Sequence, residues 1–125
     1  MRFVPVQTFL SGLTVLCIAP SVVLATGDFS RSCPDYSVRG AILYAVCRRV
    51  DGSQVTTQLD LDHCLENGNG KLVCRQNGAY ASSCSACSFS GTTLSCQCRD
   101  EESHPQYTSI DLDQCVGNSN GNLVC

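Results

Sequence analysis

The residues best suited to chemistry are four cysteines in the second half of the chain, Cys84-x-x-Cys87 followed by Cys96-x-Cys98. Four thiolates at short spacings could hold a structural zinc ion, and a Cys-x-x-Cys pair alone could serve a redox reaction. No thioredoxin-like βαβ pattern accompanies the pair. The choice between zinc, redox chemistry and disulfides therefore depends on the compartment in which the chain works.

Two acidic pairs, Asp60/Asp62 and Asp111/Asp113, could suggest calcium binding or acid–base catalysis. An Asp side chain also caps the free N–H groups at the start of a short helical turn, which explains both pairs more simply. The two histidines, His63 and His104, do not occupy equivalent positions in the internal repeat described below, and neither has an implied Ser or Cys partner. We therefore expect no catalytic or calcium-binding role for these residues.

The N-terminal segment has the features of a secretory signal peptide. Arg2 gives a positive start, and an apolar stretch from Phe9 to Leu24 leads to small residues around Ala25. We predict cleavage after Ala25, so residues 1–25 are the signal peptide and residues 26–125 form one secreted, extracellular domain. The apolar run is too short and too interrupted for a membrane span.

Cleavage would remove Cys17 from the 11 cysteines and leave 11 − 1 = 10. An even number of cysteines in a small secreted domain favours disulfides over zinc or redox chemistry. The charge after cleavage is 7 − 11 = −4, because Arg2 is one of 8 basic residues set against 11 acidic ones. The longest basic run is Arg48-Arg49, which argues against nucleic acid or an anionic membrane as a partner.

The chain contains an internal repeat. Residues 28–74 align without a gap on residues 79–125, and 18 of the 47 pairs are identical, four of them cysteines. The strongest block pairs Leu59–Cys64 with Ile110–Cys115 and continues through an Asn/Gly-rich turn. Self-similarity of this kind indicates one structural unit used twice.

Each unit is predicted to be built from short strands, and the whole is all-β with almost no helix. Glycine in a two-residue turn favours hairpins, and Asn and Gly tolerate the positive φ of tight turns. In the first unit we expect a hairpin over Tyr36–Cys47, a strand over Val50–Leu59, a helical turn at Asp60–Asp62, a tight turn at 67–70 and a strand at Leu72–Cys74.

The repeat also suggests a pairing of the ten cysteines, because equivalent bridges should occur in both copies. Cys87 and Cys96 lie at equal distances from the turn at Gly91-Thr92, so they should face each other across a hairpin. The expected bridges are Cys33–Cys47, Cys84–Cys98, Cys64–Cys74, Cys115–Cys125 and Cys87–Cys96.

The repeated cysteines, hairpins and Asn/Gly turns resemble the cyanovirin-N homology domain, a family of lectins. The resemblance is carried by Phe29–Cys33, Cys47–Arg49, Leu59–Asp62 and Glu66–Leu72. Their second copies are Tyr80–Cys84, Cys98-Arg99, Ile110–Asp113 and Asn118–Leu123. The resemblance implies a pseudo-twofold fold in which each half takes a three-stranded sheet from one repeat and a β-hairpin from the other. It also implies binding of mannose-type oligosaccharides or glycoproteins, notably of α1-2-linked mannose, without catalytic activity or a cofactor. The protein would be a monomer or a domain-swapped dimer. The alternative is a secreted cystine-rich structural or interaction protein, such as an effector or inhibitor, that uses the same scaffold without binding sugar.

The resemblance places one shallow carbohydrate pocket on each half. Short polar side chains and turn backbone suit a ring of sugar hydroxyls. The first pocket would comprise Asp28, Arg31, Ser32, Arg48, Val50, Asp51, Asn118, Ser119 and Asn120. The second would comprise Glu66, Asn67, Gly68, Asn69, Ser82, Ser83, Arg99, Asp100 and Glu101.

Overall fold

The computed structural model describes residues 27–125, so the predicted signal peptide lies outside the described residues. Short antiparallel strands joined by tight turns and single turns of 3-10 helix build this part of the chain. None of the helices in residues 27–125 is long and apolar enough to cross a membrane.

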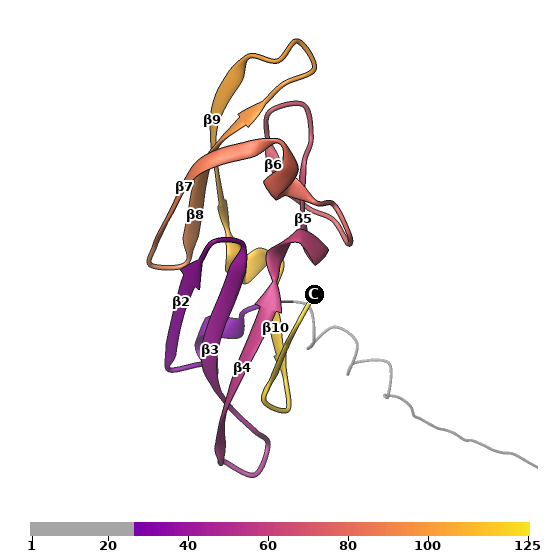
Figure 1. Ribbon diagram of the computed structural model, residues 1–125. Helices are drawn as coiled ribbons and strands as arrows, with labels where there is room; N and C mark the ends of the chain where they lie inside the picture. The colour runs from indigo at the N-terminus through magenta and orange to yellow at the C-terminus, as the bar shows by residue number, and fades with distance from the viewer. Residues whose placement is uncertain (1–26) are drawn as a thin grey trace, which may run out of the picture.

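Each repeat contributes a three-stranded antiparallel sheet and a two-stranded hairpin (Figure 1). The first repeat contains β2 (Asp35–Arg39), β3 (Ile42–Arg48), β4 (Gln54–Asp60), β5 (Leu65–Asn67) and β6 (Leu72–Cys74). The second contains β7 (Cys84–Ser90), β8 (Thr93–Arg99), β9 (Pro105–Asp111), β10 (Gly117–Ser119) and β11 (Asn122–Val124). The 3-10 turns are η2 (Phe29–Arg31), η3 (Leu61–His63), η4 (Tyr80–Ser82) and η5 (Leu112–Gln114).

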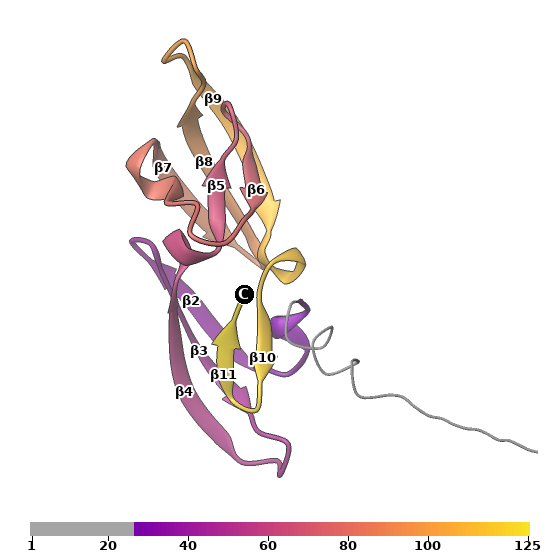
Figure 2. The same cartoon turned by 90° about the vertical axis from the view of Figure 1, so that its right-hand side faces the viewer.

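The two repeats exchange their hairpins, as the family resemblance implies. The hairpin β10–β11 lies beside the first sheet and β5–β6 beside the second, which gives an elongated molecule of two similar halves (Figure 2). A threonine fixes each hairpin: the amide of Leu123 donates to Thr57 Oγ1 (3.2 Å) and the amide of Leu72 to Thr108 Oγ1 (3.0 Å). The predicted all-β, pseudo-twofold fold is confirmed.

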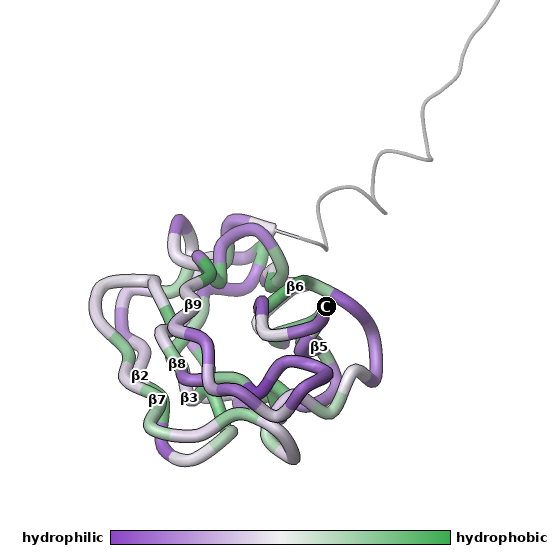
Figure 3. The backbone as a smooth tube through the Cα atoms, turned by 90° about the horizontal axis from the view of Figure 1, so that it is seen from above, coloured by the Kyte–Doolittle hydropathy of each residue, from purple (hydrophilic) through white to green (hydrophobic). Residues whose placement is uncertain are grey.

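Apolar and polar residues follow one another closely along the strands (Figure 3). On the central strands this alternation produces one buried face on each sheet. Leu43 and Cys47 point inward from β3, and Leu94 and Cys98 occupy the same places on β8. The buried apolar residues form a single core through both halves, and no polar or charged side chain in residues 27–125 is fully buried. The hairpins are therefore held by the same core as the sheets.

The third strand begins later than predicted. Residues 50–53 form a loop rather than part of the strand, because the amide of Arg49 donates to the carbonyl of Ser53 (2.7 Å) and that of Gly52 to the carbonyl of Arg49 (2.9 Å). Gly52 has a φ of 90°, which closes the loop in a conformation that extended residues do not adopt.

The acidic pairs act as helix caps, as predicted. Asp60 Oδ1 accepts the amide of Asp62 (3.0 Å), and Asp111 Oδ1 accepts that of Asp113 (3.0 Å). The second carboxylate of each pair has another role, because Asp62 accepts the amide of Ala81 (2.9 Å). Asp113 likewise binds the amide and hydroxyl of Ser30. Each pair therefore caps a turn and ties one repeat to the other.

Three of the five predicted disulfides are confirmed: Cys33–Cys47, Cys84–Cys98 and Cys87–Cys96. A β-bulge between Ser85 and Ser88 accompanies the third bridge.

The predictions of Cys64–Cys74 and Cys115–Cys125 are wrong. The structure forms Cys64–Cys125 and Cys74–Cys115 instead. Across the hairpin β5–β6 the residue opposite Cys74 is Leu65 rather than Cys64, and the hairpin exchange brings the end of each hairpin to the start of the other. The two bridges are related by the repeat, so the symmetry argument was sound but the partners lie in the opposite copy.

Candidate functional site

The predicted pocket residues gather at the two ends of the molecule, where a hairpin turn meets a loop of the adjacent sheet (Figure 2). We call the turn Asn118–Gly121 and the loop 49–53 the first site. The second site is the turn Asn67–Gly70 with the loop 100–104. The repeat relates the two sites, so their geometry can be compared residue by residue.

An asparagine organises the first site. Asn118 Nδ2 donates to Ser32 Oγ (2.8 Å) and to the carbonyl of Arg48 (2.9 Å), while its Oδ1 accepts the amide of Gly121 (2.7 Å). One side chain therefore closes its own turn and anchors it to the sheet. The backbone at this end is fixed before any ligand arrives, which lowers the entropic cost of binding.

Asn67 does the same at the second site. Its Nδ2 donates to Ser83 Oγ (2.8 Å) and to the carbonyl of Arg99 (2.8 Å), and its Oδ1 accepts the amide of Gly70 (2.7 Å). The three bonds match those of Asn118 within about 0.1 Å. The same polar framework is therefore built twice, from residues that the repeat aligns.

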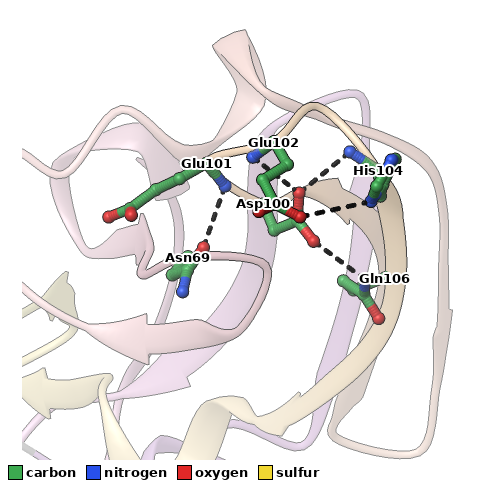
Figure 4. Close-up of polar contacts among 6 residues, drawn as sticks. All are labelled: Asn69, Asp100, Glu101, Glu102, His104 and Gln106. Atoms are coloured by element: carbon green, nitrogen blue, oxygen red, sulfur yellow. Dashed lines mark hydrogen bonds and ion pairs between the residues drawn. The ribbon is translucent and has the colours of Figure 1, made fainter.

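A second asparagine joins each turn to the facing loop. Asn120 and Asn69 have positive φ values of 47° and 52°, a conformation that asparagine tolerates better than most residues. Asn120 Oδ1 accepts the amide of Val50 (2.9 Å), and Asn69 Oδ1 accepts the amide of Glu101 (2.8 Å; Figure 4). These bonds bring the predicted residues of turn and loop together.

An aspartate inside each loop sets the loop's shape. Asp100 accepts the amides of Glu102 (2.9 Å) and His104 (2.9 Å) and the side-chain amide of Gln106 (3.0 Å; Figure 4). The bond from the His104 backbone is the largest cause that lowers the pKa of Asp100, and the other two act in the same direction. The carboxylate is therefore ionised at neutral pH and holds the loop through its accepted bonds.

Asp51 has the corresponding function in the first site. Its Oδ1 accepts the hydroxyl (2.6 Å) and the amide (2.9 Å) of Ser53, and these bonds lower the pKa of Asp51. Asp51 and Asp100 are not repeat equivalents, since Arg49 aligns with Asp100. Each loop is thus held by hydrogen bonds to an aspartate, but the two aspartates stand at different positions of the repeat.

The rims of the two sites differ in charge. The first site exposes Arg48, Arg49 and Val50, which is 92% exposed, and the carboxylate of Asp51 there is hydrogen-bonded to Ser53. The corresponding positions at the second site are Arg99, Asp100 and Glu101. The two sites share a backbone framework but present opposite electrostatic surroundings.

The remaining predicted residues lie at the margins of the two sites. Asp28 forms an isolated β-bridge with Gly117, and its neighbour Arg31 is exposed in η2. Ser82 Oγ donates to the carbonyl of Ala79 (3.0 Å), and Glu66 pairs with Arg75 (2.7 Å). Two turn residues complete the set: Ser119 is exposed, and Gly68 exchanges backbone bonds with Lys71.

Sequence reasoning missed two kinds of residue that shape the sites. Thr57 and Thr108 bind the hairpins, and Gly70 and Gly121 allow the turns to approach the sheets. A Cβ atom at Gly121 would lie 2.6 Å from Val55 Cγ1, so a larger residue would push the turn away. All four positions are identical between the repeats, which is the signal that could have found them.

A polar hollow of about 570 Å³ lies beside the second site, bordered by Asn69, Gly70, Lys71, Asp100 and Gln106 among others. Its groups are amides, hydroxyls, the carboxylate of Asp100 and the ammonium of Lys71, all of which can make hydrogen bonds to a ligand. A polyhydroxylated ligand suits such a lining, since each hydroxyl needs both a donor and an acceptor.

Comparison with known proteins agrees with this chemistry. The CVNH domain model matches residues 29–125. A cyanovirin-N homolog from Tuber borchii is 37% identical over 87 residues, covering 68% of this chain and 84% of its own length.

Two solved structures share the fold. Microvirin, solved with mannobiose, is 27% identical with a TM-score of 0.63 and covers 78% of this chain and 97% of its own. A MoCVNH3 variant in complex with (N-GlcNAc)4 reaches a TM-score of 0.73, with coverage of 80% and 97%; at 23% identity it supports the fold alone. The family match, the curated relative and the paired hairpin sites lead to one conclusion: the chain belongs to the CVNH domain family and is a carbohydrate-binding lectin rather than an enzyme.

Proposed function

We propose that the protein is a secreted lectin that binds mannose-type oligosaccharides at the first and second sites. The observation that carries the proposal is the duplicated framework, in which Asn67 and Asn118 each make the same three hydrogen bonds. A framework fixed before binding lets turn amides and carbonyls meet sugar hydroxyls at low entropic cost. The mannobiose complex of Microvirin supports mannose as the sugar.

Secretion is supported by two features of the chain. The N-terminal residues read as a signal peptide, and five disulfides in a domain of this size are typical of an oxidising compartment. Mass spectrometry of the protein recovered from the medium of an expressing cell should find an N-terminus at Thr26. Retention of the uncleaved chain inside the cell would contradict secretion.

Sugar binding is tested by titrating the oxidised, isotope-labelled domain with α1-2-linked mannobiose and following its backbone amide signals by NMR. We expect the amides of Asn67–Lys71 and Asn118–Asn122 to shift, while those in the outer face of the first sheet stay unchanged. Because each turn has its own signals, the two sites are measured separately in one experiment.

Variants then connect binding to the framework. Asn69→Ala and Asn120→Ala each break one bond between turn and loop, and each should weaken mannobiose binding at its own site up to about tenfold. Gln58→Ala, at an exposed position on the first sheet, serves as the control and should change neither site. If mannobiose shifts neither turn while a glycan array reports other sugars, mannose is the wrong sugar. If no glycan binds, the proposed sites are wrong.

A further inference from the structure

An exposed tyrosine beside the second site suggests that the site extends further. Tyr107 on β9 is 85% exposed, and with Val50 it is one of two large apolar side chains in residues 27–125 that project fully into solvent. Its place in the sheet is opposite Gln97 of β8. An aromatic ring with a polar tip is well suited to a ligand that has both an apolar face and hydroxyls.

Two hollows meet at Tyr107. One is the polar hollow that begins at Asn69 and Gly70 of the second site. The other, of about 330 Å³, lies on the outer face of the second sheet, and Tyr107, Thr108 and Ser109 line both. Both volumes fall within the range of small-molecule sites, roughly 300–1,000 Å³. A ligand seated at the turn can therefore continue past Tyr107 onto the sheet without a break.

The outer hollow has the chemistry of a sugar site. Ser88, Ser95 and Ser109 stand opposite one another on three adjacent strands, and the hydroxyls of Ser95 and Ser109 are 2.8 Å apart. Each hydroxyl has one donor and two acceptor positions, so this pair keeps bonding capacity for a ligand. No charged residue is among those that line the hollow in the described chain. A neutral polyol with an apolar face fits this lining, and a pyranose ring is such a molecule.

The first half lacks this arrangement, although the repeat gives it a corresponding hollow on its sheet. Thr56 occupies the position of Tyr107. Two tyrosines line that hollow. Tyr36 packs edge-on against Phe29, with 5.1 Å between the ring centroids, and Tyr44, on the central strand, has Arg39 over its ring at 4.6 Å from the centroid. The exposed ring next to a turn is therefore a property of the second half alone.

We propose that Tyr107 stacks on a further sugar unit of an oligosaccharide held at the second site, and that Ser88, Ser95 and Ser109 bind that unit's hydroxyls. The proposal rests on the proposed function, since the second site must hold the first sugar units. It makes Tyr107 a residue that determines how long a saccharide the second site prefers.

The test compares α1-2-linked mannobiose with the linear mannotetraose of the same linkage, using the amide signals of the labelled domain. We expect both sugars to shift the amides of Asn67–Lys71, and the tetraose alone to shift those of Ser88, Ser95 and Ser109. Tyr107→Ala should weaken tetraose binding at the second site by up to about tenfold and leave mannobiose binding unchanged. Tyr107→Phe keeps the ring and should retain tetraose affinity, and the first site should respond equally in all three proteins.

The other outcomes are distinct. Shifts at the turn by both sugars without shifts on the sheet, or equal tetraose affinity in Tyr107→Ala and the unaltered protein, would overturn the extension and leave the second site intact. A loss in Tyr107→Phe as large as in Tyr107→Ala would overturn the stacking role. Absence of any shift at Asn67–Lys71 would overturn the proposed function of the second site and the extension with it.

Discussion

A glycine in the connection between the repeats allows their backbones to approach closely. Gly78 lies in the connection between β6 and η4, where the amide of Asn77 donates to the carbonyl of His63 (2.8 Å). A Cβ atom at Gly78 would meet the carbonyl of Leu65 and lie 2.5 Å from Glu66 Cβ. Those atoms belong to β5 and its backbone, so they cannot rotate away.

We therefore expect Gly78→Ala to lower the free energy of unfolding by about 1–3 kcal/mol, the usual range for overpacking. Gly68→Ala is the matched control, because the nearest atom to its Cβ would be the carbonyl oxygen of Lys71 at an ordinary 3.6 Å. Thermal unfolding of both variants measures the difference. Equal stability of the two would show that the connection can shift to admit a methyl group.

A second residue-scale prediction concerns Tyr80, which is buried in the core. Burial raises the pKa of Tyr80 to about 12, and the charges of Asp62 and Asp60 act in the same direction. The folded state therefore holds the proton more tightly than the unfolded state, in which the pKa is near 10. The stability that this contributes is complete below pH 10 and is lost as the pH rises from about 10 to about 12.

Tyr80→Phe has no proton to lose and should show a weaker decline of the unfolding midpoint over that pH interval. Tyr107→Phe, at an exposed ring, is the control and should follow the unaltered protein. An identical alkaline decline in Tyr80→Phe would mean that another group causes it.

At this scale the sequence predicted what depends on near neighbours. The caps of Asp60 and Asp111 join residues two apart, and local spacing was enough to find them. The bonds of Asn118 reach Ser32 and Arg48, which are 86 and 70 residues away. Such bonds exist only after the hairpin has docked, so residue types alone could not reveal them and only the family resemblance pointed to the region.

Among the elements, the exchanged hairpins are held by Cys64–Cys125 and Cys74–Cys115. Removal of Cys64–Cys125 alone would not open a loop of 61 residues, because the chain is still closed through the other bridge by a path of (74 − 64) + (125 − 115) = 20 residues. The Cys87–Cys96 bridge is nested inside Cys84–Cys98, which leaves a path of (87 − 84) + (98 − 96) = 5 residues.

The entropy of closing each loop sets how much unfolding free energy is lost when its disulfide is removed. Replacing Cys64 and Cys125 with alanine should cost about 3 kcal/mol of unfolding free energy, and replacing Cys87 and Cys96 about 2 kcal/mol. Removing Cys74–Cys115 in addition to Cys64–Cys125 should cost about 3.5 kcal/mol more, because Cys84–Cys98 shortens the newly opened loop to (84 − 74) + (115 − 98) = 27 residues. Denaturant unfolding of the three proteins measures this. A cost for removing Cys87–Cys96 as large as that for removing Cys64–Cys125 would contradict this order.

The disulfide error shows where repeat reasoning ends. The repeat established that bridges must come in related pairs, and it placed Cys33–Cys47 and Cys84–Cys98 correctly because both lie within one hairpin. It could not tell a bridge inside each copy from a reciprocal bridge between copies, since both obey the same symmetry. The hairpin exchange decides the matter, and that is a property of the assembled halves.

On the scale of the whole molecule, the two sites lie at opposite ends of an elongated body (Figure 2). Each end therefore meets a ligand in its own electrostatic field, and the fields differ. Arg31, Arg48 and Arg49 outnumber Asp28 and Asp51 at the first site, whereas Asp100, Glu101 and Glu102 outnumber Arg99 and Lys71 at the second. Charges at one end are screened from the other by salt, whose Debye length is about 8 Å under physiological conditions.

The two sites should consequently discriminate between neutral and anionic forms of one sugar. Phosphorylated mannobiose should bind the first site about fivefold more tightly than plain mannobiose and the second site about fivefold more weakly, since one exposed charge contact is worth roughly 1 kcal/mol. The amides of Asn118–Asn122 and Asn67–Lys71 report the two affinities in one titration. Raising the salt from about 0.05 M to about 0.5 M should shrink both differences, because screening acts on the phosphate and not on the hydroxyl contacts. Equal preference at both ends would show that the turn framework alone, and not the charged rim, governs recognition.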